Sequence, residues 1–382
     1  MANNNLAQQA LVLHKKFRGK IEVMPKVKLN LPKELALAYT PGVAAASNAI
    51  AKDPKKALDY TAKGNMVAVV TDGSAVLGLG DIGPEAAIPV MEGKCAIFKK
   101  FAGIDAFPIC LKTQKVSEII NIVENISPNF SGINLEDISS PRCFEVETKL
   151  AKKLNIPVFH DDQHGTAIVV LAGLINALKL VKKPLSKVQV VINGAGAAGF
   201  ATAQLLYRAG VKNLIVLDSK GIISRKRDYL YPHKKELLKM ILKEPSVGGL
   251  EEALREADVF IGLSRGCPLP PGMIRSMNKN PIVFALANPD PEILPDTAIK
   301  NGVAIAATGR SDFPNQLNNA LVFPGFFRGL LDGKIPRVTV KMKLAAAHAL
   351  ADLVKNPTAK KIIPSIFDKR VVPAVAKAVI KE

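Results

Sequence analysis

The chain has 382 residues, a length that predicts two or three domains of roughly 150 residues, each able to bury its own core. Hydrophobic residues make up 48% of the chain and charged residues 22%, which is the composition of a globular protein. Aromatic residues reach only 5% and tryptophan is absent, so Ala, Val, Ile and Leu must form most of the core. Such a core suits helices packed on parallel strands.

The formal net charge of +19 is high for a chain of this length. Attraction of anionic ligands or nucleic acid is one interpretation, and a generally lysine-rich protein is the other. Lysines are scattered from Lys15 to Lys381, and the basic runs lack interleaved aromatic residues. The second interpretation is favoured, and we expect no nucleic-acid partner.

The cysteines and the N-terminus exclude several classes of protein. The N-terminal stretch lacks the basic start and the long apolar run of a secretory signal. No uninterrupted apolar run reaches the ~18 residues of a membrane span. The cysteines do not form the CxxC spacing of a metal site; they are Cys95, Cys110, Cys143 and Cys267. We therefore expect a cytoplasmic, reduced protein with no membrane partner.

The first 60 residues predict helices and one notable tyrosine. Residues 6–17 have the pattern of a short amphipathic helix, and an Ala-rich helix is predicted from Val43 to about Lys52. Tyr39 stands just before Thr40-Pro41, where a stiff turn would hold its ring. Taken alone, this position fits a packing tyrosine as well as a functional one.

The next segment contains an isolated lysine. A buried strand is predicted over residues 65–71, and a glycine-rich loop follows it before Pro84 begins a helix. Within that helical region Lys94 has apolar neighbours on both sides in the sequence. Such a lysine is a candidate for a lowered pKa, although its ammonium group more often reaches solvent.

Two acidic pairs follow neighbouring strands of a predicted βαβ unit. The strand over residues 130–135 ends at Glu136-Asp137, and the strand over residues 156–159 ends at His160-Asp161-Asp162. A helix over residues 142–154 joins them, so the carboxylates lie at the same end of both strands. One pair alone fits a helix N-terminus capped by acids. The two pairs together favour an oxygen-rich site for Mg²⁺ or Mn²⁺ rather than Zn²⁺.

The second half of the chain carries a dinucleotide-binding pattern. A strand over residues 188–193 leads into Gly194-Ala195-Gly196-Ala197-Ala198-Gly199, and a helix runs from there to Ala209. The strand over residues 213–217 then ends at Asp218. This context, with an acid about 20 residues after the glycines, is that of a Rossmann fold that holds a pyrophosphate at a helix N-terminus.

Three further strands are predicted, over residues 259–263, 282–286 and 303–307, and a helical tail from Lys341 onward is expected to pack back on the sheet. Asn288 and the Asn318-Asn319 pair lie in the loops after these strands. They fit a nicotinamide or substrate contact, or simple turn chemistry. The predicted fold class is α/β with two domains, an N-terminal domain over residues 1–160 and a Rossmann-like domain with parallel sheet and C-terminal helices over residues 161–382.

Several motifs together resemble the short prokaryotic type of malic enzyme over nearly the whole chain. They are YTPGVA, TDGSAVLGLGDIGPEAAIPVMEGK, NLEDISSPRCFEVE, FHDDQHGTA, GAGAAG, ANPDPEILP and ATGRSDFPNQLNNALVFPG. The resemblance implies that residues 1–160 form the malic enzyme catalytic domain. It also implies oxidation of L-malate with NAD⁺ or NADP⁺ and decarboxylation to pyruvate and CO₂, with a divalent cation, Mg²⁺ or Mn²⁺.

The same resemblance implies a role for each matching residue. Lys94 is implied as the general base, supported by Asp161, with its pKa well below the ordinary value. Tyr39 is implied as the general acid that protonates the enol carbon. The implied metal ligands are Glu136, Asp137 and Asp162. The implied cofactor contacts are Gly194, Ala195, Gly196, Ala197, Ala198, Gly199, Asp218 and Asn288. The implied substrate contacts are Ser74, Asn288, Asn318 and Asn319.

The sequence departs from the larger malic enzymes in two places. Ala75 stands where they carry an arginine that holds a substrate carboxylate, so the group with that role is open. The chain also ends at residue 382, without the additional acyltransferase-like domain of some bacterial relatives, so we expect no regulation through one.

Three questions stay open from the sequence. Asp218 favours NAD⁺, whereas Ser219, Lys220 and the basic run 225–227 favour a 2′-phosphate, so use of both nucleotides is slightly preferred. A malolactic or oxaloacetate-decarboxylating relative would share every motif. A basic NAD-sensing or nucleic-acid-binding protein would have lost catalytic residues that this chain keeps. We expect a homodimer or a higher homo-oligomer.

Overall fold

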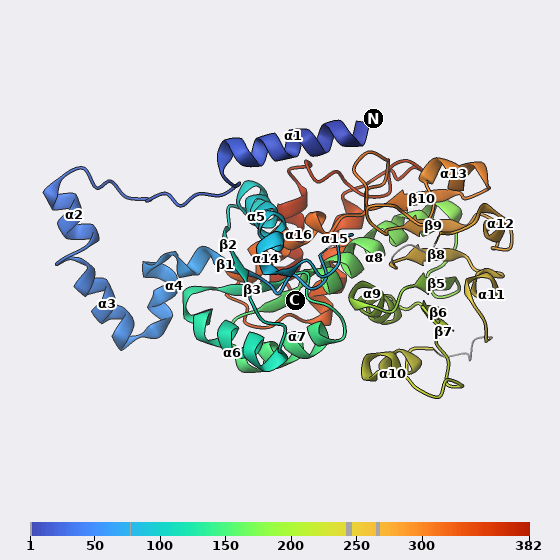
Figure 1. The fold of residues 1–382 in the computed structure, drawn as a ribbon, viewed down its shortest axis with the longest axis horizontal. Helices are drawn as coiled ribbons and strands as arrows, with labels where there is room; N and C mark the ends of the chain where they lie inside the picture. The colour runs from blue at the N-terminus through green and yellow to red at the C-terminus, as the bar shows by residue number, and fades with distance from the viewer. Residues whose placement is uncertain (1, 77, 242–246, 265–267) are drawn as a thin grey trace.

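The computed structural model describes residues 2–76, 78–241, 247–264 and 268–382, so Cys267 lies outside the described part. Two sheets lie side by side along the longest axis of the molecule (Figure 1). The first has the strand order β2-β1-β3-β4 and is parallel throughout. Its strands are β1 (Met66–Thr71), β2 (Asp105–Cys110), β3 (Gly132–Leu135) and β4 (Val158–His160).

The second sheet has the order β10-β9-β8-β5-β6-β7, with only β7 antiparallel among the described strands. Its central strands are pure apolar runs buried on both faces, as parallel sheets covered by helices require. The strands are β5 (Gln189–Asn193), β6 (Asn213–Asp218), β7 (Gly221–Ile222), β8 (Val259–Gly262), β9 (Ile282–Ala285) and β10 (Ile305–Thr308).

Alternate residues of β1 enter different cores. Ala68 and Val70 pack with α6 and α7, whereas Val67 and Val69 belong to a larger core on the opposite face. That larger core continues through α8 and α9 to β5 of the second sheet, so the two sheets share one apolar interior. The helices concerned are α5 (Gly83–Ala102), α6 (Val116–Ile126), α7 (Arg142–Lys153), α8 (Asp161–Val181) and α9 (Ala197–Arg208).

The C-terminal helices pack on the first sheet as well as on the second. The Phe98 ring of α5 lies 4.7 Å from Phe323 and 5.3 Å from Phe327 of α14, measured between centroids. Figure 1 accordingly shows α14 to α16 in the middle of the molecule, beside α5. The bounds are α14 (Phe323–Asp332), α15 (Val340–Asp352) and α16 (Val371–Ile380). The expected helical tail is thus interrupted over residues 353–370, and α14 was not predicted.

Shorter helices complete the second half, and α8 is the central helix of the fold. On length and composition alone α8 could cross a membrane, but 67% of its apolar window is buried inside the protein. The helix α8 is therefore long and apolar because it lies in the core of the protein. The remaining elements are α10 (Pro232–Leu238), α11 (Leu250–Leu254), α12 (Pro271–Ile274), α13 (Pro295–Lys300), and the 3₁₀ turns η3 (Ser127–Asn129) and η4 (Asn319–Leu321).

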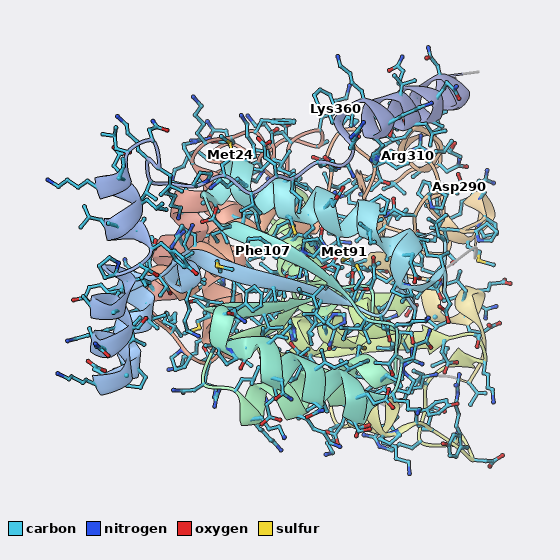
Figure 2. The ribbon with its side chains drawn as sticks, turned by 60° about the vertical axis from the view of Figure 1, so that its left-hand side comes forward. Met24, Met91, Phe107, Asp290, Arg310 and Lys360 are labelled. Atoms are coloured by element: carbon cyan, nitrogen blue, oxygen red, sulfur yellow. The ribbon has the colours of Figure 1, made fainter. Side chains whose placement is uncertain are left out.

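The N-terminal segment stands apart from this body. Figure 2 shows the two helices of residues 32–52 projecting away from it on the left, with side chains directed outward. We call α2 and α3 with the turn between them (residues 32–52) the N-terminal arm; no residue of either helix is buried. The elements are α1 (Ala2–Phe17), α2 (Pro32–Ala38), α3 (Val43–Lys52), η1 (Pro54–Lys56), α4 (Ala57–Tyr60) and η2 (Ala62–Asn65), which leads into the amino end of β1.

Candidate active site

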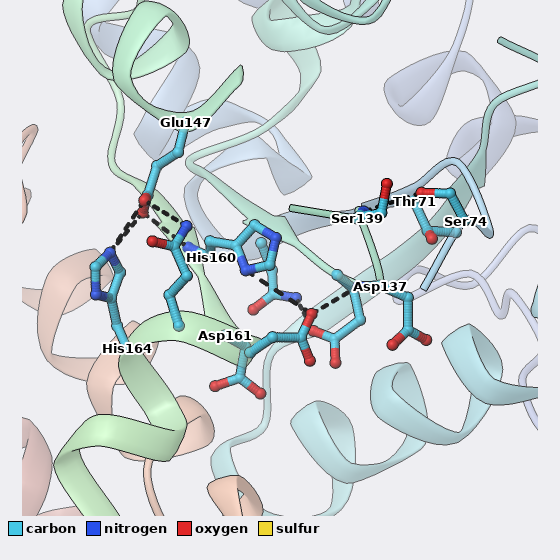
Figure 3. Close-up of polar contacts among 12 residues, drawn as sticks. Thr71, Ser74, Asp137, Ser139, Glu147, His160, Asp161 and His164 are labelled. Carbon is cyan, nitrogen blue, oxygen red and sulfur yellow. Dashed lines mark hydrogen bonds and ion pairs between the residues drawn. The ribbon is translucent and has the colours of Figure 1, made fainter. Parts of the chain in front are cut away.

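Three carboxylates meet where β3 and β4 end. Glu136 and Asp137 follow β3, and Asp162 lies in the first turn of α8, which begins directly after β4. One oxygen from each of the three lies within 4.8 Å of the others. Asp162 is fixed in this arrangement because its Oδ2 accepts a hydrogen bond of 2.8 Å from the backbone N–H of Asp137. Figure 3 shows Asp137 meeting the start of α8 at this edge.

The sequence predicts an apolar helix over residues 167–180, directly after the acidic segment. In the structure this helix is α8, which begins earlier, at Asp161, and includes the whole acidic segment. Its first turn therefore carries Asp161 and Asp162, where the helix dipole favours negative charge. The acids lie on a rigid helix end rather than in a loop.

Lys94 lies against this carboxylate cluster. It projects from α5, is 8% exposed, and donates hydrogen bonds to Glu136 and to Asp161. Its ammonium group also lies 4.6 Å from the centroid of the Phe323 ring. The lysine therefore does not reach solvent, and the expected neighbour Asp161 is in contact with it.

The expected low pKa of Lys94 is wrong for the protein without a cation. Burial alone would lower the pKa of Lys94, but the charges of Asp161 and Glu136 outweigh burial and raise it above the ordinary value. Residue spacing shows only the apolar neighbours of Lys94 along its helix. The resemblance implied Asp161 as a partner, and the contact with Glu136 was not anticipated.

The carboxylate cluster has the properties of a cation site. Burial and, after it, the neighbouring carboxylates raise the pKa of Glu136, Asp137 and Asp162 above their ordinary values. Asp137 Oδ2 is buried and has no hydrogen-bond partner among the described residues. All-oxygen donors suit a hard divalent cation such as Mg²⁺ or Mn²⁺, whose charge would offset this repulsion. The residues present therefore fit the metal that the resemblance implies.

A second polar group behind the acids was not predicted. Glu147 of α7 accepts hydrogen bonds from the backbone N–H of His160 at 3.0 Å and from Gln163 at 3.0 Å. It also contacts His164 Nε2 at 2.8 Å (Figure 3). Glu147 thus anchors the strand-to-helix junction that carries the acids. In the sequence Glu147 is one of several acids in a predicted helix, and nothing in that pattern indicates that it anchors the junction.

The glycine-rich turn has the geometry of a dinucleotide site. A Cβ on Gly194 would lie 2.6 Å from the Leu263 carbonyl oxygen, and one on Gly199 would lie 1.7 Å from the Gly194 carbonyl oxygen. Gly196, in contrast, has nothing within 4 Å of that position. The outer glycines are thus required for close packing, and the middle one leaves room at the start of α9. A cavity of about 750 Å³ opens there and reaches Asp218.

Asp218 forms ion pairs with two basic side chains. Its carboxylate lies 2.8 Å from Arg227 Nη1 and 2.6 Å from Lys234 Nζ. Although burial opposes ionisation, hydrogen bonds from Lys234 and Arg227 hold the pKa of Asp218 below its ordinary value. Lys234 was not anticipated as a residue of this site.

The asparagines lie in different positions around the acids. Asn319 lies beside the start of α8, since a Cβ on Gly165 would meet both the Asn319 Cβ at 3.0 Å and Asp161 Oδ1 at 1.9 Å. The Asn318 side-chain oxygen accepts from the Ala320 N–H at 2.8 Å, which leaves its amide nitrogen available. Asn288 donates to the Leu286 carbonyl at 3.2 Å within its own turn.

Ser74 and the loop around Ala75 are already engaged. The Ser74 hydroxyl donates to Asp72 Oδ1 at 2.5 Å and accepts from the Ser139 N–H at 2.9 Å. Arg142, which was not predicted as a site residue, lies 3.3 Å from Asp72 Oδ2. Arg142 therefore lies near the loop that has Ala75 where the larger malic enzymes have an arginine. Its guanidinium group is paired with Asp72.

Tyr39 is not brought to the other site residues within the chain. It is the residue at the end of α2 on the N-terminal arm, and 67% of it is exposed. The arm joins the first sheet at the amino end of β1 through α4 and η2, whereas the acids lie at the carboxyl ends of β3 and β4 (Figure 1).

A parallel sheet with a lysine and acids at its carboxyl edge, joined to a Rossmann-like domain, defines a dehydrogenase with a candidate cation site. Residues 18–151 match the malic enzyme N-terminal domain, and residues 163–382 match the malic enzyme NAD-binding domain. The chain therefore belongs to the malic enzyme family.

Individual relatives agree with this assignment. The chain is 53% identical over 380 residues to a bifunctional malic/malolactic enzyme of Bacillus subtilis, covering 99% of this chain and 93% of the relative. It is 51% identical over 379 residues to an NAD-dependent malic enzyme of Geobacillus stearothermophilus, covering 99% and 79%. The solved NAD-dependent malic enzyme of Thermotoga maritima superposes with a TM-score of 0.93 at 48% identity, covering 97% and 98%.

Proposed function

We propose that this protein oxidises L-malate with NAD⁺ or NADP⁺ and decarboxylates it to pyruvate and CO₂, with Mg²⁺ or Mn²⁺ bound at Glu136, Asp137 and Asp162. The observation that carries this proposal is the meeting of these three carboxylates beside the buried Lys94. Relatives named as NAD-dependent and as NADP-dependent malic enzymes support the use of either nucleotide.

The chain's own residues divide the chemistry between them. With the divalent cation bound, Lys94 would be neutral and would accept the proton of the C2 hydroxyl, and Asp161 orients the amine through their hydrogen bond. The nicotinamide, when bound, would supply the acceptor for the C2 hydride. A bound divalent cation supplies Lewis-acid polarisation of the substrate oxygens. Asn318 and Asn319, at the start of η4, are the proposed contacts to the substrate, and Asn288 is proposed to contact the substrate or the nicotinamide.

The nucleotide is proposed to bind in the cavity at the start of α9. Gly196 leaves space for the pyrophosphate, and the N-terminus of α9 favours its negative charge. Asp218, Arg227 and Lys234 surround the position of the adenosine ribose. An aspartate suits the 2′-hydroxyl of NAD⁺, and the two cations suit the 2′-phosphate of NADP⁺.

The acid that protonates the enol carbon is proposed to come from a second copy of the chain. Tyr39 lies on an arm whose apolar side chains are exposed, among them Leu35 at 52% and Leu37 at 68%. An exposed apolar surface of this kind marks an interaction site. In a two-fold homodimer the arm of one copy would pack on the other copy, which would bury these apolar side chains. Tyr39 would then reach the active site of the other copy.

Mixing two inactive variants tests this arrangement. If the site combines Lys94 of one copy with Tyr39 of the other, a mixed dimer of Tyr39→Phe and Lys94→Ala contains one intact site. Random exchange of equal amounts should restore about a quarter of wild-type malate oxidation, because half of the dimers are mixed and half of their sites are intact. No recovery after confirmed exchange would assign Tyr39 to its own chain or remove it from the reaction.

The activity itself is tested by following products. Malate with Mn²⁺ and either nucleotide should yield reduced cofactor, CO₂ and pyruvate in equal amounts. Lactate without net cofactor reduction would instead support the malolactic alternative, which the name of the Bacillus subtilis relative keeps under consideration.

A further inference from the structure

Glu292 is a buried acid that the proposed reaction does not use. It lies in the segment between β9 and α13, and only 5% of it is exposed. Its carboxyl group fills the space beside Gly262, the last residue of β8, where a Cβ would lie 2.2 Å from Glu292 Oε1. Burial raises the pKa of Glu292 to about 7, although hydrogen bonds from backbone N–H groups, that of Ala287 among them, oppose the rise. Because burying an ionisable group costs free energy, a role for its oxygens is indicated.

The Glu292 side chain closes the turn that carries Asn288. Its Oε2 accepts a hydrogen bond of 3.2 Å from the Ala287 N–H, and its backbone oxygen accepts one of 2.8 Å from the Leu269 N–H. The other carboxyl oxygen, Oε1, is buried without a hydrogen-bond partner among the described residues. One carboxyl group therefore fixes the N–H directly before Asn288 and also lies against the end of β8.

The strand order shows which end of the nucleotide this turn faces. Asp218, the proposed ribose contact, ends β6, and the glycine-rich turn follows β5. The strands β8 and β9 lie on the other side of β5, in the order β9-β8-β5-β6. With the adenosine at β6 and the pyrophosphate at β5, the nicotinamide end of a bound nucleotide would point to β8 and β9. Leu263 and Ser264, directly after β8, line the nucleotide cavity and agree with this direction.

The same turn contacts the first domain. A Cβ on Gly78 would lie 2.8 Å from Pro289 Cδ and 3.1 Å from the Asn288 carbonyl oxygen. Gly78 belongs to the glycine-rich loop after β1, which also contains Ser74. The turn therefore lies between the nucleotide cavity and the proposed malate site, where the C2 hydride would be transferred.

We propose that Glu292 is a positioning residue, which holds the turn of Ala287 and Asn288 at the ends of β8 and β9 and thereby places Asn288 against the nicotinamide. This inference rests on the proposed nucleotide site, and it assigns Asn288 to the nicotinamide rather than to malate. Loss of the acceptor would leave the Ala287 N–H without a partner and release the turn. The effect would be confined to the nicotinamide end, because the glycine-rich turn and Asp218 hold the pyrophosphate and the ribose.

Comparison of NADH with ADP-ribose, which lacks the nicotinamide, tests the proposal. Calorimetric titration of the full chain without malate gives both dissociation constants; NADPH and 2′-phospho-ADP-ribose replace the pair if only NADP⁺ is used. Glu292→Leu should weaken NADH binding about tenfold, the scale of one hydrogen bond, and change ADP-ribose binding less than about twofold. Glu292→Gln keeps a carbonyl oxygen for the Ala287 N–H and should bind NADH as the wild type does. Glu145→Leu, at an exposed acid of α7 paired with Lys149, is the control and should change neither.

Three results would overturn the proposal. Equal weakening of NADH and ADP-ribose by Glu292→Leu would mean that the acid supports the whole nucleotide cavity. Unchanged NADH binding would mean that the turn does not depend on the acid. A loss in Glu292→Gln as large as in Glu292→Leu would exclude the hydrogen bond to Ala287 as the cause.

A second variant covers the case in which Glu292→Leu does not fold. Glu292→Asp keeps the acid but draws its oxygens away from the Ala287 N–H, so the same selective loss of NADH binding is expected. Wild-type NADH binding by Glu292→Asp would overturn the proposal as well. None of these measurements depends on malate oxidation, so their failure is distinguishable from failure of the proposed activity.

Discussion

Lys94 contacts Glu136 and Asp161, and these contacts determine how its amine can act as a base. In the absence of a cation both carboxylates hold the lysine protonated. The two histidines of the same segment are the competing bases. Burial lowers the pKa of His160 to about 4, and its Nδ1 lies 3.8 Å from Asp162 Oδ2, on the side of the proposed cation site. His164 is turned toward Glu147 and Lys343.

Replacement of Lys94 should therefore have the larger effect. We expect Lys94→Ala to lower kcat for malate oxidation by ~10²–10⁴-fold, the usual contribution of a general base. His160→Asn should keep most of the oxidation rate. Steady-state rates of nucleotide reduction at saturating malate measure both. The base is misassigned if a histidine variant silences oxidation while Lys94→Ala retains it.

Asp218, together with Arg227 and Lys234, should determine the preference for NAD⁺ or NADP⁺. Asp218→Ser removes the acceptor for a ribose hydroxyl and releases Arg227 and Lys234 toward a 2′-phosphate. The ratio of kcat/KM values should shift toward NADP⁺ by roughly 1–3 kcal/mol, the scale of one hydrogen-bonded discrimination. Lys234→Gln is the matched variant and should shift the ratio in the opposite direction. An unchanged ratio in both would move selection to other residues.

At the scale of elements, the site depends on how closely α8 approaches η4. A Cβ at Gly165 would lie 1.9 Å from Asp161 Oδ1 and 3.0 Å from the Asn319 Cβ. Only a glycine permits both groups to stay where they are.

Gly165→Ala should accordingly displace Asp161 or Asn319. We expect a loss of stability of about 1–3 kcal/mol, typical of an overpacked interior, together with a raised KM for malate. Gly272→Ala in α12, where a Cβ would meet nothing within 4 Å, is the control and should change neither. Chemical unfolding and malate kinetics measure the two effects, and wild-type behaviour of Gly165→Ala would argue against this close packing.

The regular elements were largely predictable from the sequence, because apolar runs and glycine turns mark them locally. The predicted strand over residues 65–71 corresponds to β1, and the helix predicted from Val43 to about Lys52 is α3. The start of α8 was missed because its first turn is polar while its apolar run begins later. Lys234 and Glu147 were missed because their partners belong to other elements of the fold, and residue spacing does not show which elements face each other.

At the scale of the whole molecule, the C-terminal helices join the two sheets. Phe327 is fully buried against Phe98 of α5, and Gly132 of β3 packs on the same ring. The sequence predicted these helices as part of the second domain, over residues 161–382, because they follow it in the chain. Their contacts with the first sheet depend on side chains about 200 residues apart, which the sequence pattern could not pair.

Truncation of this aromatic contact should destabilise both halves together. Phe327→Ala should cost about 3–5 kcal/mol of unfolding free energy, as for other large core side chains. Phe367→Ala, at a ring that is 78% exposed, is the matched control and should cost far less. Calorimetry should record one shifted transition in Phe327→Ala. Two separate transitions would mean that the sheets unfold independently.

The position of Tyr39 also belongs to this scale. The sequence places a tyrosine before a stiff turn, but it contains no information on which copy of the chain that turn approaches. The exposed arm supports our proposal that Tyr39 completes the site of a second copy, since no residue of α2 or α3 is buried within the described chain.

Binding of Mn²⁺ to metal-free protein tests the central claim most directly. EDTA-treated protein should be inactive, and one Mn²⁺ per chain, counted by electron paramagnetic resonance of the free ion, should restore malate oxidation in proportion to its binding. Asp137→Asn should lose this binding while keeping the fold, because Asp137 provides the buried oxygen without a partner. Full activity without metal, or unchanged Mn²⁺ binding by Asp137→Asn, would contradict the assignment of Glu136, Asp137 and Asp162 as the cation site.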